Sequence, residues 1–292
     1  MRPSVYISLI IKAAIAVALT IFSTAVLFGQ DKAGKAEYKE RTSEFCSSNN
    51  SWGDKVSVND VRQLTLPAGG SLAVDGNRNG GIKVRGENRG DIQVRACVQA
   101  WGTTEEAARS LIGGVRIATS PVLKAEAAGE ENWSVSYEIL VPRNTDLQLT
   151  AHNGGIAISS VEGRLSFETT NGGVHLQEVG GEVRGRTTNG GVHVQLAGNS
   201  WRGSGLDVQT TNGGVHVAMP DSYAANFEMG TTNGGFKSDI AGLAVEKKDK
   251  DREWSRPSRV TAAINGGGAP IRLITTNGGV HISSTRGAEY KY

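Results

Sequence analysis

The chain has 292 residues, of which 21% are charged and 38% are hydrophobic, and its formal net charge at pH 7 is +2. The surplus comes from Arg2 and Lys12, because residues 30–292 hold equal numbers of basic and acidic residues. A chain without net charge lacks the basic surface that binds nucleic acids or anionic membranes, and we expect no nucleic-acid partner.

Residues 1–29 have the pattern of a signal peptide. Arg2 and Lys12 precede an uncharged apolar run from Ala13 to Phe28, which is short for a membrane span of about 20 residues but suits a signal peptide. We therefore expect an exported protein, located in the periplasm, in the cell envelope or outside the cell. An uncleaved N-terminal anchor is the alternative, and only in that case would a membrane be a partner.

Residues 30–55 form a polar leader segment, and this segment contains one of the two cysteines of the chain, Cys46. The other, Cys97, lies 51 residues further on. In an exported chain such a pair most simply forms a disulfide, which would tie the leader to the first strands. No histidine lies close to either cysteine in the sequence, which disfavours a reactive thiol or a metal site.

Residues 56–150 carry short alternating stretches such as Leu72–Val74, Ile82–Val84 and Ile92–Val94, and we expect them to form the first coils of a repeat structure. One helix is predicted within them, over residues 104–112. Thr103 is its expected N-cap, and Glu106, three residues later, would complete a capping box.

Residues 151–285 contain a regular repeat. Eight Asn-Gly-Gly triplets occur in the chain, and successive Asn residues from Asn153 to Asn233 are 18, 18, 23 and 21 residues apart. This spacing suits one coil of a β-solenoid and is too short for helical repeats. The sequence Thr-Thr-Asn-Gly-Gly-Val-His stands at 169–175, 187–193, 210–216 and 275–281, with a Phe-Lys variant at 231–237.

The predicted fold is therefore all-β, a single-domain parallel β-solenoid with one short N-terminal helix, followed by a C-terminal tail at residues 286–292. The step of 44 residues from Asn233 to Asn277 would fit two coils, with Asn265 as a degenerate rung between them.

Alternation within each repeat assigns a direction to every motif residue. The first Thr points inward and the second outward. Asn then falls at an inward corner, where identical side chains of successive coils can bond to one another at about 4.8 Å spacing. The two glycines are expected to supply positive φ and to let the coils approach closely. The predicted Asn ladder consists of Asn171, Asn189, Asn212, Asn233 and Asn277.

The histidines after each corner point outward and form a predicted surface column. Neighbouring imidazoles of His175, His193 and His216 could share Zn²⁺ or Cu²⁺. The alternative is that repetition of the motif copied a tolerated surface residue, since no column of carboxylates completes a metal site.

Signals of catalysis are weak. The carboxylates of the repeats occupy unrelated positions, and the chain has no Gly-x-Ser-x-Gly elbow, no phosphate-binding loop and no His-Glu-x-x-His motif. We therefore expect no enzyme and no cofactor.

The chain resembles the bacterial family labelled "putative adhesin", β-solenoid domains of unknown function. The resemblance covers about residues 64–285 and rests on the Asn-Gly-Gly repeats, on Leu66–Leu72, on the Val141-Pro142 step and on Ile264–Ile271. It implies a non-enzymatic surface or envelope scaffold that binds an envelope protein or a glycan. An envelope-stress accessory or sensor is a second implied role, and a metal-binding module or a β-helix enzyme are further alternatives.

Overall fold

A computed structural model describes residues 45–46, 54–129, 131–243 and 259–285. The chain divides into two units after Glu40, and every described residue belongs to the second unit. The expected signal peptide, most of the leader and the C-terminal tail therefore lie outside the described residues. Within the described ranges, no helix is long and apolar enough to span a membrane.

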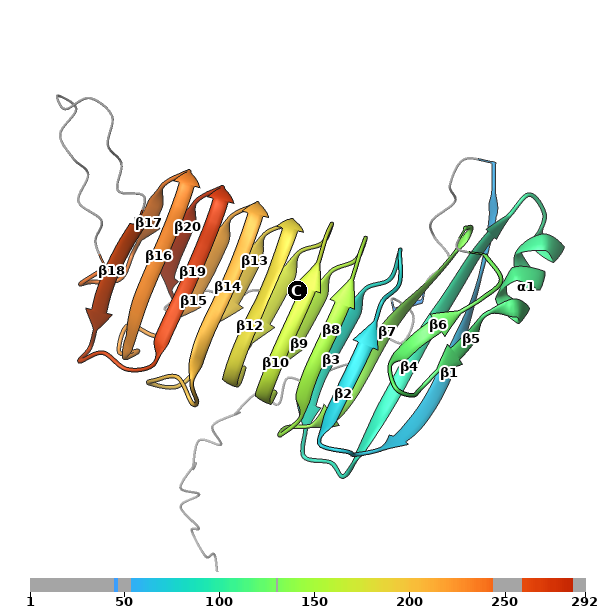
Figure 1. Ribbon diagram of the computed structural model, residues 1–292, viewed down its shortest axis with the longest axis horizontal. Coiled ribbons are helices and arrows are strands. Elements are labelled where there is room, and N and C mark those ends of the chain that lie inside the picture. The colour runs from blue at the N-terminus through green and yellow to red at the C-terminus, as the bar shows by residue number, and fades with distance from the viewer. Residues whose placement is uncertain (1–44, 47–53, 130, 244–258, 286–292) are drawn as a thin grey trace, which may run out of the picture. The chain divides into compact units, whose positions relative to one another are not determined.

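The second unit is built almost entirely from strands, which form two ten-stranded sheets (Figure 1). In spatial order, sheet A contains β1 (Val56–Pro67), β4 (Asp91–Gly102), β7 (Trp133–Pro142), β3 (Ile82–Glu87), β9 (Ile156–Ser159), β11 (Val174–Gln177), β13 (Val192–Gln195), β15 (Val215–Met219), β20 (Val280–Ser284) and β17 (Phe236–Ser238). Sheet B contains β18 (Arg259–Ile264), β16 (Ala225–Asn233), β19 (Pro270–Asn277), β14 (Gly205–Asn212), β12 (Gly180–Asn189), β10 (Glu162–Thr169), β8 (Asp146–Ala151), β2 (Ser71–Asp75), β6 (Leu123–Glu126) and β5 (Arg116–Ala118).

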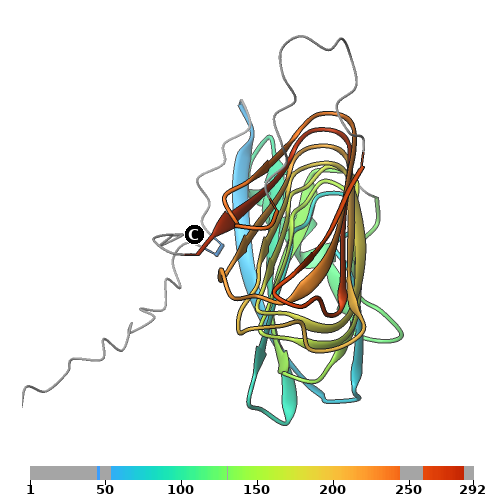
Figure 2. The same cartoon turned by 90° about the vertical axis from the view of Figure 1, so that its left-hand side faces the viewer.

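The repeats form solenoid-like coils in which the two sheets face each other (Figure 2). In one coil, β10 of sheet B passes through an Asn-Gly-Gly corner into β11 of sheet A, and the chain then returns to β12 beside β10. Neighbouring coils pair in parallel and in register, so Val174 lies beside Val192 and Leu165 beside Val183. These four side chains are at most 1% exposed, because the alternation turns them into the core between the sheets.

The N-terminal end of the unit departs from the predicted parallel coils. Residues 72–74 and 82–84 do form one coil, in β2 and β3, but residues 92–94 lie in β4, which pairs antiparallel with β1 and β7. Residues 92–94 therefore form a strand, as predicted, but this strand is not part of a coil. Alternation reports burial on one face and carries no information on strand direction.

The predicted helix is α1 (Glu105–Gly114), and it begins one residue later than the sequence suggests. Thr104, not Thr103, is the N-cap, because its Oγ1 accepts a hydrogen bond from the backbone N–H of Ala107 at 3.2 Å. The helix packs on β1 and β4 and buries Ala108 and Ile112.

The C-terminal coil is inserted between two earlier ones. Strands β19 and β20 lie between β14–β15 and β16–β17, although β16 and β17 precede them in the sequence. The segment before them, β18, pairs antiparallel with β16 at the edge of sheet B. The prediction of two successive coils with Asn265 as a rung is therefore wrong. Asn265 lies in the turn after β18, where its side chain donates to the carbonyl oxygens of Asp221 and Tyr223.

Candidate functional site: the corners and the outer face of sheet A

The corners contain a continuous ladder of asparagine side chains. Each Nδ2 donates to the Oδ1 of the Asn in the neighbouring coil, over 2.7–2.9 Å. The spatial order of the ladder is Asn79, Asn153, Asn171, Asn189, Asn212, Asn277 and Asn233. The five ladder residues expected from the exact repeats are all members, and the looser copies at Asn79 and Asn153 extend the ladder.

The ladder is exposed to solvent, contrary to the expectation of an inward position. The first Thr of each copy takes the buried position next to it, as the alternation predicts. Thr187 is 2% exposed, and its Oγ1 donates to the carbonyl oxygen of Gly172 in the neighbouring coil at 2.8 Å. Thr169, Thr210, Thr231 and Thr275 make the equivalent bond.

The glycines of the repeat corners serve one of their two expected purposes, the close approach of the coils, but not the other. The two glycines that follow each of Asn153, Asn171, Asn189, Asn212, Asn233 and Asn277 lack the positive φ predicted for the motif, whereas Gly266 and Gly267, in the turn at Asn265, have φ values of 91° and 78°. The first glycine of each pair is required by the close approach of the coils, since a Cβ on Gly190 would lie 2.1 Å from the carbonyl oxygen of Gly172. The second glycine has more room, and a Cβ on Gly191 would meet no atom closer than 3.4 Å.

The histidines form a column on the outer face of sheet A. The rings of His175 and His193 stack with centroids 5.0 Å apart, and those of His193 and His216 with centroids 5.4 Å apart. A fourth ring, His281, meets His216 edge-on at 5.1 Å. The position of His281 beside His216 does not follow from the sequence, because the spacing of the motifs does not reveal that the last coil is inserted. The exact copy of the motif at 275–281 is the feature of the sequence that indicates an equivalent position for His281.

Burial lowers the pKa of His175, His193 and His216 below the ordinary value of a histidine. The neighbouring rings add to this effect at His193, and His281 and Lys237 add to it at His216. The column therefore favours uncharged imidazoles at neutral pH.

Metal binding by His175, His193 and His216 stays a prediction. The nitrogen lone pairs lie in the ring planes, so two stacked rings do not direct them to one ion between the rings. Among the residues that the structure describes, no group of three or more His, Cys, Asp or Glu is arranged to hold a metal ion.

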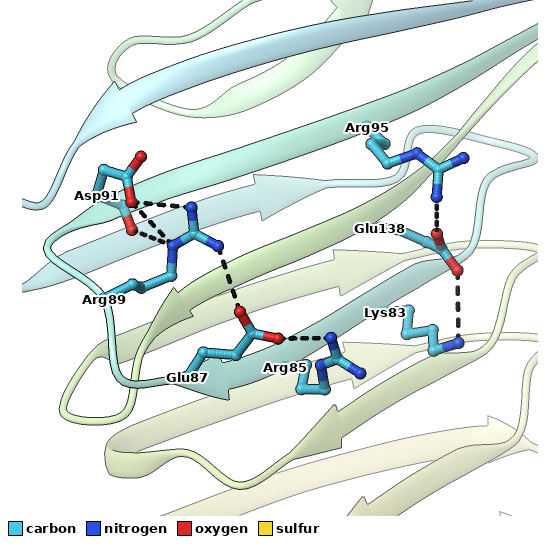
Figure 3. A network of polar contacts seen from close by, with 7 residues as sticks. All are labelled: Lys83, Arg85, Glu87, Arg89, Asp91, Arg95 and Glu138. Carbon is cyan, nitrogen blue, oxygen red and sulfur yellow. Dashed lines mark hydrogen bonds and ion pairs between the residues drawn. The ribbon is translucent and has the colours of Figure 1, made fainter. Parts of the chain in front are cut away.

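The histidine column is the central part of one row that crosses sheet A. Register places Lys237 beside His281 at one end, and Ala157 and then Lys83 beyond His175 at the other. The next position of the row is Glu138, which binds Lys83 at 3.4 Å and Arg95 at 3.0 Å (Figure 3). The charges at this end of the row are therefore paired with each other.

A second set of charges lies on the neighbouring part of the same face. Glu87 binds both Arg85 and Arg89, at 2.5 and 3.5 Å, and Arg89 also binds Asp91 at 2.8 Å (Figure 3). These ion pairs lie at the end of β3 and in the turn that leads from β3 to β4. These paired charges thus lie at the N-terminal end of sheet A.

The outer face of the repeat coils in sheet A is largely uncharged. Beside the histidines runs a second row, which consists of Ser159, Gln177, Gln195, Ala218 and Ser283. At the C-terminal end of this face, His281 Nε2 lies 3.6 Å from a carboxylate oxygen of Asp239. A hollow of about 430 Å³ borders the column at Ala157 and is lined by Phe45, Lys83 and His175.

The outer face of sheet B differs, because its charges are paired from coil to coil. Arg186 binds Glu168 at 2.8 Å, and Arg272 binds Asp207 and Glu228 at 3.1 and 3.5 Å. Arg164 also binds Asp146 at 3.0 Å. The backbone N–H of Arg164 donates to Asp146 and holds the pKa of this carboxyl below its usual value.

The two cysteines, Cys46 and Cys97, are joined by a disulfide whose Cα atoms are 5.5 Å apart. Cys97 is in β4, and the bond holds the described part of the leader against sheet A. Phe45, next to Cys46, covers the guanidinium of Arg95 at 5.1 Å and contributes to the hollow beside the histidine column.

The sequence model of the family described as Toastrack DUF4097 matches residues 69–287. No curated protein matches the sequence. Among solved structures, a putative cell adhesion protein from Clostridium sporogenes is 11% identical, with 78% of this chain and 100% of that chain covered and a TM-score of 0.40. A putative adhesin from Parabacteroides merdae is 9% identical, with 77% and 95% covered and a TM-score of 0.33. Another from Bacteroides fragilis is 8% identical, with 78% and 97% covered and a TM-score of 0.28.

Proposed function

The chain belongs to the Toastrack DUF4097 family, whose function is unknown, and from this premise we propose that it is an exported, non-enzymatic β-solenoid that binds a component of the cell envelope. In this proposal the repeats form one solenoid domain, and its regular surface acts as a scaffold or adhesin-like binding face. The partner is an envelope protein or a glycan.

The observation that carries the proposal is the difference between the two outer faces. Sheet B satisfies its charges within the protein, since Arg186 and Arg272 each bind carboxylates of neighbouring coils. Sheet A instead presents imidazole, amide and hydroxyl groups at the same positions of successive coils. Such groups can bind a partner without first losing an ion pair, and their desolvation costs less than that of a charge.

The experiment is a binding measurement between the purified, processed protein and isolated envelopes of the producing bacterium. In one variant, Gln177→Glu and Gln195→Glu place two charges side by side on the outer face of sheet A. The matched control, Gln148→Glu with Ser166→Glu, places two charges on adjacent strands of sheet B. We expect at least a fivefold loss of envelope binding in the sheet A variant and wild-type binding in the control.

Two outcomes would contradict this proposal. If the wild-type protein does not bind envelopes, the role as an envelope-binding scaffold is wrong. If both variants bind as the wild type does, sheet A is not the binding face. Envelopes treated with protease before the measurement separate the partners, because loss of binding would indicate a protein and favour the role of an accessory or sensor of envelope stress.

A further inference from the structure

A cavity of about 460 Å³ lies at the corner where the regular stack of Asn-Gly-Gly turns ends. We call this cavity the corner pocket. It is separate from the outer face of sheet A and was not foreseen from the sequence. The side chains that matter for its chemistry are those of Asp75, Arg78, Asn79, Trp133, His152 and Glu168.

The corner pocket exists because the coil next to Asn79 is incomplete. On one side β7 replaces a repeat strand, and the N–H of Tyr137 donates to the carbonyl oxygen of Gly81 at 2.8 Å. On the other side the Asn77 side chain pairs with both backbone groups of Ala125, at 3.1 and 3.2 Å. No Asn-Gly-Gly corner joins these two neighbours. Trp133, at the start of β7, lines the space instead and is only 7% exposed.

The asparagine ladder ends in this pocket with unused hydrogen-bond donors. All six ladder bonds run in one direction, with each Nδ2 donating toward the coil nearer the N-terminal end. Asn79 accepts from Asn153 at 2.9 Å, and its own Nδ2 has no acceptor among the described residues. Aligned hydrogen bonds polarise one another, so the terminal amide is a stronger donor than an isolated one.

The pocket combines such donors with acceptors. Arg78 is exposed and has no ion pair among the residues that the structure describes. Asp75 accepts from the backbone N–H of Asn77 at 2.8 Å through one oxygen, and its carboxylate keeps further acceptor capacity. Glu168 lies on another wall, where it also binds Arg186.

This mixture of charges selects the ligand by its chemistry. A simple anion in the pocket would meet the carboxylates of Asp75 and Glu168, and a simple cation would meet the guanidinium of Arg78. A sugar hydroxyl both donates and accepts, so it satisfies the two kinds of group at once. The cavity volume is in the range of small-molecule sites, and the largely buried Trp133 forms part of its lining.

We propose that the corner pocket binds one neutral sugar residue of a glycan. In this complex Arg78 and Asn79 donate to the sugar oxygens, and Asp75 accepts from a hydroxyl. The inference rests on the proposed function, to which it gives a chemical class of partner. The proposed function and the pocket inference can be tested separately. The pocket lies at the corner of the coils, whereas the variants that test the proposed function change residues on the outer face of sheet A.

The experiment uses the purified protein without the predicted signal peptide. Saturation-transfer NMR tests binding of glucose, galactose, mannose and N-acetylglucosamine, and each sugar that binds is then titrated to obtain its affinity. Arg78→Gln removes the free guanidinium without breaking an ion pair of the described residues. Arg143→Gln makes the same change at another exposed position away from the pocket. We expect saturable binding of at least one neutral sugar, a tenfold or greater loss of affinity in Arg78→Gln, and wild-type affinity in Arg143→Gln.

Three results would overturn the inference: no saturable binding of any of the four sugars, equal affinity of Arg78→Gln and wild type, or binding of glucuronate with none of glucose. Thermal unfolding of both variants checks that they fold. The envelope assay run on Arg78→Gln then separates the two proposals. If this variant keeps full envelope binding and the wild type binds no sugar, the pocket inference fails while the scaffold proposal stands.

Discussion

The two glycines of each corner differ in the space that they leave, and this difference is open to a direct test. Gly190→Ala would force a methyl group to within 2.1 Å of a backbone carbonyl oxygen, and backbone cannot move aside as a side chain can. Gly191→Ala meets the end of the His193 side chain at 3.4 Å. We expect Gly190→Ala to lower the free energy of unfolding by about 3 kcal/mol or more and Gly191→Ala by less than about 1 kcal/mol.

Urea unfolding of the two variants measures this difference, with Gly113→Ala as a control because a Cβ there meets nothing within 4 Å. Equal losses at Gly190 and Gly191 would mean that the pair is needed for its backbone flexibility. The close approach of the coils would then not be the reason for the motif.

At the scale of a single element, the histidine column should make stability depend on pH. The folded-state pKa of His175, His193 and His216 is lowered, so the unfolded chain binds protons more readily. Stability is therefore complete above the unfolded pKa of about 6.5 and is lost as the pH falls below it. Each adjacent pair of charged rings about 5 Å apart would repel by about 1 kcal/mol before screening by salt.

We expect the wild type to lose more stability than His193→Gln between pH 7.5 and pH 5, by about 1 to 2 kcal/mol, because the variant interrupts the column at its centre. Urea unfolding at the two pH values measures the free energy of unfolding of each protein. His152→Gln, a change outside the column, should keep the wild-type pH dependence. An identical pH dependence in all three proteins would show that the rings do not repel one another.

The insertion of β19 and β20 is a property of the whole unit and predicts how it responds to truncation. In a solenoid whose coils follow chain order, removal of the last coil uncovers only the one before it. Here, deletion of residues 259–292 removes β18 and β19 from both sides of β16. We expect the amides of β16 to lose protection from hydrogen exchange while those of β10–β13 keep it.

Deletion of residues 286–292 alone is the control and should leave β16 protected. Continued protection of β16 in the longer deletion would mean that β16 and β17 can pack directly on β14 and β15. The stability of β16 would then not depend on the inserted coil.

The sequence predicted the repeat structure because every contact of a coil is made with its neighbours and recurs with the motif. Alternation around Thr187 and Val192 was enough to assign the core and the outer face. The order of the last coils could not be predicted. The motif around Asn277 closely resembles the motifs around Asn212 and Asn233, so the sequence does not show beside which of them it packs. The corner pocket was missed for a related reason: it arises where Trp133 interrupts the pattern.

In the coils between β10 and β13, each asparagine bonds the asparagine of the neighbouring coil, each buried threonine bonds a corner glycine of the neighbouring coil, and the histidine rings stack on one another. Because these contacts recur from coil to coil, such a coil is interchangeable with its neighbours. The asparagines of these coils are 18 residues apart, and duplication of 18 residues would add one more rung, one more core layer and one more ring to the column. The antiparallel strands at one end and the inserted coil at the other would be unaffected. The number of coils, and with it the length of the outer face of sheet A, can therefore change by duplication of a short stretch of the gene.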